Sequence, residues 1–249
     1  MKISTSLYFN NATTQLGNVQ GELSKTQEQL SLGKQIVKPS DMPDKAALIT
    51  RLESELSRQT GYQNTLKAVN IRLTAEETAL KNTTDVMYRI KELALQAAND
   101  TLSSADRQSV ALELSNLKDQ VLSLANSQDS NGNYLFSGSR NSSPAFAKDA
   151  SGKVLYQGDQ ARMKVNVGDS RQMSLNMPGT DAFIRVVRDD AKGNKTGVDF
   201  FQSLDDLVSA VQSGDHTNIQ RGIGEVDTLQ NGISQGLGQI GSDMSIVDM

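Results

Sequence analysis

The feature that most constrains this chain is a long stretch without helix breakers, because residues 62–131 contain neither Gly nor Pro. Apolar residues recur within this stretch at steps of three, four and seven, which places them on one side of an α-helix. The first series is Leu66, Val69, Leu73, Leu80, Met87 and Ile90, and the second is Val110, Leu114, Leu117, Val121 and Leu124. An apolar seam of this kind must be buried against another helix, so the pattern predicts long helices packed side by side.

Helix boundaries follow from the flanking residues. Pro39 and Pro43 cannot lie within one regular helix, and Pro43 is suited to a first turn, so a long helix is expected from about residue 43 to 98. Its seam begins at Leu52 and Leu56. Ser103 followed by Asp106 is typical of a cap for the next helix, which should end near residue 128. The short link between the two helices predicts an antiparallel pair.

A third helix is expected at the end of the sequence. Its apolar stripe includes Ile223, Val226, Leu229, Ile233 and Leu237. Several glycines interrupt the stripe, and each costs a helix roughly 0.5–1 kcal/mol relative to Ala. This helix therefore needs tertiary partners, and the two earlier helices are the obvious ones. We expect the three seams together to form the core of a helical rod.

Between residues 139 and 197 the apolar period changes to about two. Short strands are predicted at 154–156, 163–167, 173–177 and 183–187, separated by turn residues, and residues 189–197 should be a polar return loop. The fold class is thus mainly α with a small β insertion: an elongated antiparallel helical rod, like a coiled-coil bundle, plus an inserted antiparallel β-domain. The predicted domains are residues 1–42, residues 43–138 with 198–249 (the rod), and residues 139–197 (the β-domain).

The N-terminal segment has an apolar stripe of its own. Leu16, Val19, Leu23 and Leu30 are spaced for one helix face, and Leu7 extends the stripe. Most of the remaining residues are Asn, Gln, Ser, Thr and Glu, so the helix should be marginal alone and flexible in the monomer. These five apolar residues are the predicted assembly interface, and residues 1–42 the predicted assembly helix and linker.

Composition excludes several classes of function. Aromatic residues make up 4% of the chain, Trp and Cys are absent, and the net charge is −4. A mildly acidic surface argues against nucleic acid as a partner, and no apolar run is long enough to span a membrane. The N-terminus has no apolar core of a signal peptide, so export by the general secretory route is not expected.

Three motifs resemble chemical sites, but their context argues against that interpretation. Residues 236–241 match GxGxxG, yet no strand precedes them and Leu237 belongs to the helical stripe. The Asp129-x-Asn131-x-Asn133 pattern lacks the later ligands of a calcium loop. His216 is the only histidine and has no Cys to join it in a zinc site. We therefore predict no catalytic, cofactor or metal site, and no enzymatic activity.

Several segments resemble the flagellin-like family of bacterial flagellar proteins. These are residues 1–6, 30–36, 39–43, 89–99, 124–126 and 131–138, and the Tyr-Gln-Gly-Asp of residues 156–159 is similar to the hook–filament junction branch of that family. Leu32 and Met42 depart from the residues usual there. A further departure is that the family's chain normally continues into a last long helix that pairs with the N-terminal one, so a C-terminal helix is expected beyond Met249.

The resemblance implies a structural adaptor of the flagellum rather than an enzyme. Its implied partners are copies of itself in a ring, the first hook-associated protein, flagellin, and an export chaperone before secretion. The implied location is outside the cell, in the flagellum, after passage through the flagellar export channel. Three alternatives remain: a flagellin of the filament itself, a secreted coiled-coil factor acting on host cells or membranes, and an enzyme housed in the β-domain.

Overall fold

The computed structural model describes residues 2–39, 42–99, 102–189 and 194–247. Residues 1–61 form one compact unit (unit 1) and residues 62–249 another (unit 2). The long helix α2, Pro43–Ala97, contributes to both. The three-part division made from the sequence stays a prediction.

Unit 1 contains helix α1, Lys2–Leu32, and the first part of α2. Helix α1 ends at Gly33, which has a φ of 63° that an L side chain rarely adopts. The backbone N–H groups of Gly33 and Lys34 donate back to carbonyls of the last helical turn, at Leu30 and Gln29. This closes the helix and turns the chain into the linker of residues 34–39.

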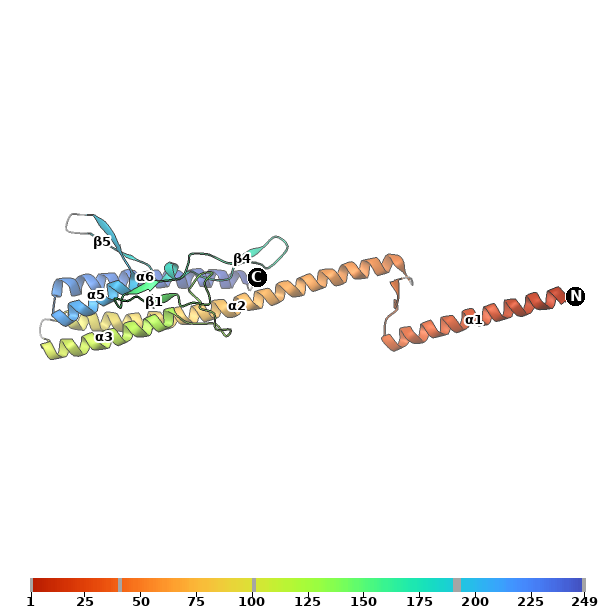
Figure 1. The fold of residues 1–249 in the computed structure, drawn as a ribbon, viewed down its shortest axis with the longest axis horizontal. Coiled ribbons are helices and arrows are strands. Elements are labelled where there is room, and N and C mark those ends of the chain that lie inside the picture. The colour runs from red at the N-terminus through yellow and green to blue at the C-terminus, as the bar shows by residue number, and fades with distance from the viewer. Residues whose placement is uncertain (1, 40–41, 100–101, 190–193, 248–249) are drawn as a thin grey trace. The chain divides into compact units, whose positions relative to one another are not determined.

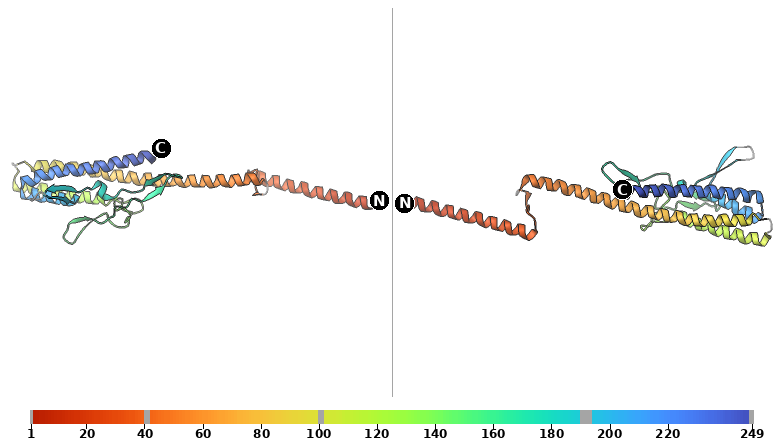
Figure 2. Two further views of the ribbon diagram at one scale, coloured as in Figure 1. Left: turned by 90° about the horizontal axis from the view of Figure 1, so that it is seen from above. Right: turned by 180° about the vertical axis from the view of Figure 1, so that it is seen from behind.

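Unit 2 is built on four helical segments that lie side by side in Figures 1 and 2: the second part of α2, α3 (Ser104–Ala125), α5 (Phe200–Ser213) and α6 (His216–Val247). Helix α5 packs against both α3 and α6. Helix α3 begins with a capping box, in which the Ser103 side chain accepts from the Asp106 backbone and the Asp106 side chain accepts from the Ser103 backbone.

The bundle buries most of the apolar seams. Val69, Leu73, Leu80, Met87, Ile90, Val110, Leu114, Val121, Val226, Leu229 and Ile233 are buried, while Leu66, Leu117, Leu124, Ile223 and Leu237 are partly buried and pack against them. Leu52 and Leu56 were expected in this core, but they are 57% and 68% exposed. A seam is buried only along the length that partner helices cover, and the buried positions of α2 begin at Val69.

The chain between α3 and α5 forms three antiparallel hairpins instead of one sheet. The pairs are β1 (Phe146–Lys148) with β2 (Val154–Tyr156), β3 (Lys164–Asn166) with β4 (Gln172–Ser174), and β5 (Val186–Asp189) with β6 (Lys195–Val198). A short helix, α4 (Gly179–Ala182), precedes β5. The predicted class, mainly α with a small antiparallel β insertion, is confirmed.

Two strands differ from the sequence-based prediction. Strand β1 was not predicted, and three of the four residues of β6 lie in the segment expected to be a loop. Three of the four residues of β6 are exposed, so pairing with β5 stabilises this strand rather than burial. A strand that is stabilised by pairing alone need not alternate apolar and polar residues, so its sequence carries no pattern from which it could be predicted.

An aromatic cluster joins the hairpin region to the helices. Its rings belong to Phe136, Phe146, Tyr156, Phe183, Phe200 and Phe201, mostly in edge-to-face contact with centroids 5.1–5.6 Å apart. Five of the six Phe residues of the chain lie here. The few aromatic residues are therefore concentrated at one junction, where the first turn of α5 contacts hairpin β1–β2.

One glycine of the GxGxxG sequence, Gly236, serves helix packing, and so does Gly232 just before the motif. A Cβ atom added to Gly236 would lie 3.0 Å from the Ala182 Cβ atom, and one added to Gly232, a turn earlier, would lie 2.6 Å from the Ile184 side chain. These glycines let α4 and the segment after it approach α6 closely. The motif lies inside helix α6, in its second half, without the preceding strand of a dinucleotide site.

Candidate assembly surface

The predicted assembly interface is exposed on α1. Leu16, Val19, Leu23 and Leu30 are between 57% and 84% exposed. Burying one such side chain is worth about 1.5–3 kcal/mol, so each is a source of binding free energy that unit 1 does not use. Four exposed aliphatic side chains at helical spacing form a stripe, in contrast to the scattered exposed leucines of an ordinary surface.

The N-terminal end of this stripe differs from the one predicted. Leu7 is exposed, but nine residues of a regular helix place it about half a turn away from Leu16. Steps of four and three back from Leu16 lead instead to Ala12 and Phe9, with Tyr8 beside them. Tyr8 and Phe9 are 75% and 70% exposed. We define the α1 stripe as Tyr8, Phe9, Ala12, Leu16, Val19, Leu23 and Leu30.

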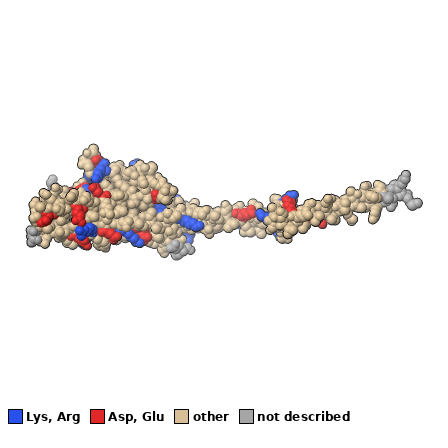
Figure 3. Space-filling view, turned by 90° about the horizontal axis from the view of Figure 1, so that it is seen from below, with Lys and Arg blue, Asp and Glu red and all other residues tan. Residues whose placement is uncertain are grey.

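Apart from Leu7 and Leu32, the exposed side chains of α1 outside the stripe are mainly polar and carry little charge. The visible surface of this helix in Figure 3 is mostly uncharged. Thr13, Thr14 and Thr26 direct their hydroxyl groups to the carbonyl oxygens four residues earlier, at 2.8–2.9 Å. These three hydroxyls are satisfied within the helix and therefore add little to binding by α1.

A second apolar area lies at the beginning of α2. The linker of residues 34–39 runs beside the first turns of α2 and leaves a groove of about 690 Å³. Leu48, Ile49 and Leu52 line the groove and are exposed, and Lys34 and Lys45 are also among its lining residues. Unit 1 thus presents apolar side chains on both of its helices.

Unit 2 contains a partly buried network of charged groups. Arg188 of β5 donates to both carboxylate oxygens of Glu225 on α6, at 2.6 and 2.7 Å, and also to Asp206 on α5. Burial alone would raise the pKa of Glu225, but the bonds from Arg188 and Ser203 outweigh it and hold that pKa below its usual value. The network fixes hairpin β5–β6 to the two helices.

The Asp129 pattern, for which a calcium loop was rejected from the sequence, is a hydrogen-bonded turn. The Asp129 carboxylate accepts from the backbone N–H groups of Asn131 and Asn133, at 2.8 and 2.9 Å, and forms an ion pair with Arg72. Burial tends to raise the pKa of Asp129, but these N–H donors outweigh it and lower the pKa. Across the described residues, no three metal-ligating side chains lie together.

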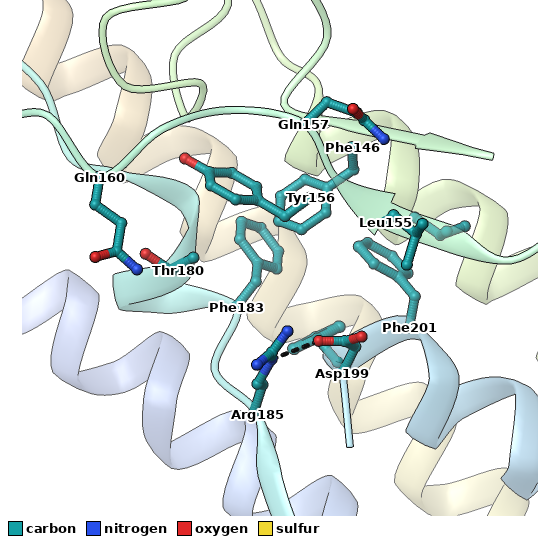
Figure 4. Close-up of a pocket in the computed structure, with 12 residues that line it drawn as sticks. Phe146, Leu155, Tyr156, Gln157, Gln160, Thr180, Phe183, Arg185, Asp199 and Phe201 are labelled. Carbon is teal, nitrogen blue, oxygen red and sulfur yellow. Dashed lines mark hydrogen bonds and ion pairs between the residues drawn. The ribbon is translucent and has the colours of Figure 1, made fainter. Parts of the chain in front are cut away.

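A pocket of about 500 Å³ opens beside the aromatic cluster (Figure 4). Its one carboxylate, Asp199, accepts from Arg185 at 2.6 Å. The Tyr156 hydroxyl donates within the fold, to the carbonyl oxygens of Phe136 and Asp159, and burial raises its pKa to about 12. The lining residues offer no nucleophile with an adjacent base, so the pocket gives no support to an enzyme in the β region. The only histidine of the chain, His216, is the first residue of α6 and does not line this pocket.

Comparison with known proteins gives a consistent picture. The family model of the bacterial flagellin N-terminal helical region matches residues 3–141. Flagellar hook-associated protein 3 of Salmonella typhimurium is 26% identical over 246 residues, covering 96% of this chain and 77% of that protein. Flagellar hook-associated protein 3 of Escherichia coli is 29% identical over 216 residues, covering 86% and 67%. A filament core protein of Treponema maltophilum is 30% identical over 175 residues, covering 68% and 58%.

Solved structures share the fold. FlgL from Xanthomonas campestris superposes with a TM-score of 0.68 at 23% identity, covering 78% of this chain and 94% of that one. The flagellar junction protein FlgL from Legionella pneumophila superposes with a TM-score of 0.71 at 17% identity, covering 81% and 99%. No helix among the described residues has an apolar stretch long enough to cross a lipid bilayer.

Proposed function

Because this chain belongs to the bacterial flagellin N-terminal helical family, we propose that it is a structural subunit of the flagellum that joins the hook to the filament. Two relatives that each match more than 85% of this chain are flagellar hook-associated protein 3, and a third, flagellin B of Vibrio anguillarum, matches 92% of it. The role is structural and not enzymatic, and its place is the flagellum outside the cell.

The observation that carries this proposal is the exposed α1 stripe. In unit 2 the apolar seams are buried within the chain, whereas the stripe on α1 remains exposed. Burial of its four aliphatic side chains against neighbouring helices would supply several kcal/mol per subunit, and a closed ring repeats that contact at every subunit. In this proposal residues 1–42 form the assembly segment, residues 43–138 with 198–249 the rod, and residues 139–197 the β part.

The proposed partners follow from a position between hook and filament. They are further copies of the chain in a ring, the first hook-associated protein on the hook side and flagellin on the filament side, with an export chaperone before secretion through the flagellar channel. The matched filament proteins make flagellin itself the second candidate function. The two candidates differ in where the subunit is found along the flagellum.

Electron microscopy of flagella labelled with antibody to this chain separates the two candidates. We expect a narrow band where the hook meets the filament. Label along the whole filament would establish the flagellin alternative, and label absent from flagella would reject both.

A point substitution tests the role of the stripe. Leu23→Asp places a charge on the α1 stripe, and Ser24→Asp places the same charge on the next, exposed residue of the same helix. We expect Leu23→Asp to prevent incorporation into flagella while the unfolding temperature of unit 2 is unchanged, and Ser24→Asp to assemble. Assembly of Leu23→Asp at the wild-type level would remove the stripe from the assembly mechanism.

A further inference from the structure

One carboxyl group of unit 2 is buried without being fully paired. The Glu76 side chain, in the middle of α2, is 0% exposed. Its Oε1 atom accepts from the Met177 backbone N–H at 3.4 Å and lies 3.3 Å from the Arg72 Nε atom. Its Oε2 atom is also buried and has no hydrogen-bond partner. An ionised carboxylate has several acceptor positions to satisfy, and this environment satisfies few of them.

The nearby cation is shared with another carboxylate. Arg72 lies one turn before Glu76, and its guanidinium also forms an ion pair with Asp129, at 3.4 Å. The same guanidinium donates to the carbonyl oxygens of Leu135 and Tyr134, at 2.9 and 3.3 Å. Arg72 thus links α2 to the loop after α3, and its single positive charge faces two carboxyl groups.

The hydrogen bonds to Asp129 stabilise its ionised form more than the environment of Glu76 would stabilise an ionised Glu76. Two backbone N–H groups donate to Asp129, and the side-chain amide of Asn133 donates as well. With Asp129 ionised, Arg72 is already neutralised, and ionisation of Glu76 would leave a net negative charge in a buried cluster. Asp243 on α6 also acts on Glu76, and its charge has the same sign.

We propose that Glu76 is a proton-binding site of the folded chain: unit 2 holds this side chain as a neutral acid, and folding therefore takes up a proton. Burial is the largest influence on the pKa of Glu76 and raises it from 4.5 to about 8, against the opposing effect of Arg72. The charged groups acting on the site are Arg72, Asp129 and Asp243, from α2, the loop after α3, and α6.

The direction of the pH dependence follows from this shift. The folded-state pKa lies above the unfolded value, so the stabilisation is complete below about pH 4.5 and is lost as the pH rises through about 8. Within that window one proton is released on unfolding, and the equilibrium constant for unfolding rises nearly tenfold per pH unit.

The test is urea unfolding of the full chain, followed by near-ultraviolet circular dichroism of the aromatic cluster. We expect the unfolding constant of the wild type to rise roughly hundredfold between about pH 5.5 and 7.5. Glu76→Gln, which keeps the shape without the titration, should remove most of that rise and match the wild type at the acidic end. An equal rise in the wild type and in Glu76→Gln would overturn the proposal.

Glu225→Gln is the matched control, since Glu225 is also buried but is held ionised by Arg188. This variant should be less stable and should keep the wild-type rise between pH 5.5 and 7.5.

A measurement on the wild type covers the case in which Glu76→Gln does not fold. Carbon-13 NMR of carboxyl-labelled chain should show one Glu side chain that titrates well above the others in the folded state. A spectrum in which every Glu side chain is ionised at neutral pH would reject the proton site.

Discussion

Two glycines of helix α6 lie in opposite environments, and replacing each with Ala separates close packing from helix propensity. A Cβ atom at Gly232 would lie 2.6 Å from the Ile184 Cγ1 atom and 3.1 Å from the Ala182 carbonyl oxygen. A Cβ atom at Gly238 would have no atom within 4 Å outside its own helix segment. The two positions are less than two turns apart, so they share one helix and differ in their neighbours.

The expected magnitudes have opposite signs. Gly→Ala at an open helical position stabilises by about 0.5–1 kcal/mol, and this is the whole effect expected for Gly238→Ala. Overpacking a close contact costs about 1–3 kcal/mol. The Ile184 side chain can shift, but the backbone oxygen of Ala182 can move only together with α4. We therefore expect Gly232→Ala to lower the free energy of unfolding by roughly 1–2 kcal/mol, after its gain in helix propensity.

Urea unfolding and thermal melting of the full chain measure both variants. A change of 1 kcal/mol corresponds to a shift of about 2–4 °C in Tm for a unit of this size. Gly238→Ala should melt above the wild type and Gly232→Ala below it. If Gly232→Ala were stabilised as much as Gly238→Ala, the close approach of α4 to α6 would be refuted. The glycines at positions 232 and 236 would then need another explanation.

Two further substitutions test the bundle, with the same unfolding measurement. Ser103→Ala removes the side-chain acceptor of the capping box and should lower the free energy of unfolding by about 1 kcal/mol; an unchanged value would mean that the cap does not contribute. Leu229→Ala, at a fully buried position of α6, should lower it by about 2–5 kcal/mol, whereas Leu112→Ala, at an exposed position of α3, should change it by no more than about 0.5 kcal/mol. Similar losses for the two leucines would contradict the assigned core.

The sequence predicts the helices well because their seams repeat over many turns. The long helix was expected at about 43–98 and spans Pro43–Ala97. The sequence does not predict how far along that helix the apolar seam is buried. Leu52 and Leu73 have the same residue type and follow the same seam, yet Leu52 is exposed and Leu73 is buried. The difference depends on how far the other helices run beside α2, which no local pattern records.

The buried Arg72–Glu76 pair could not be found from spacing alone. At an i, i+4 spacing the two residues look like any exposed salt bridge of a long helix. Their burial arises because the loop after α3 and the chain around Met177 fold over this part of α2. Those contacts join residues 63 and 101 positions apart in sequence. Local periodicity cannot predict contacts between residues so far apart in the sequence.

The beginning of the α1 stripe shows how helical phase and residue type can disagree. Leu7 was included because it is apolar, although the steps of three and four that define the stripe lead from Leu16 to Phe9. Applied strictly, the same rule would have identified Phe9, and Tyr8 beside it. Helical phase is therefore a better guide than residue type at the end of a stripe, where few turns remain to average out an outlying residue.

Helices α1 and α6 show why the stripe on α1 points to a partner beyond unit 1. Both contain glycines, each of which costs a helix about 0.5–1 kcal/mol. In α6 the cost is offset inside unit 2, where Gly222, Gly232 and Gly236 are closely covered by other side chains. In α1 nothing lies within 4 Å of a Cβ added at Gly17 or Gly21, and the apolar stripe of the same helix is exposed. Among the described residues of unit 1 no contact offsets these costs, so we expect α1 to gain stability when its stripe is buried against another helix, as in the proposed ring of subunits.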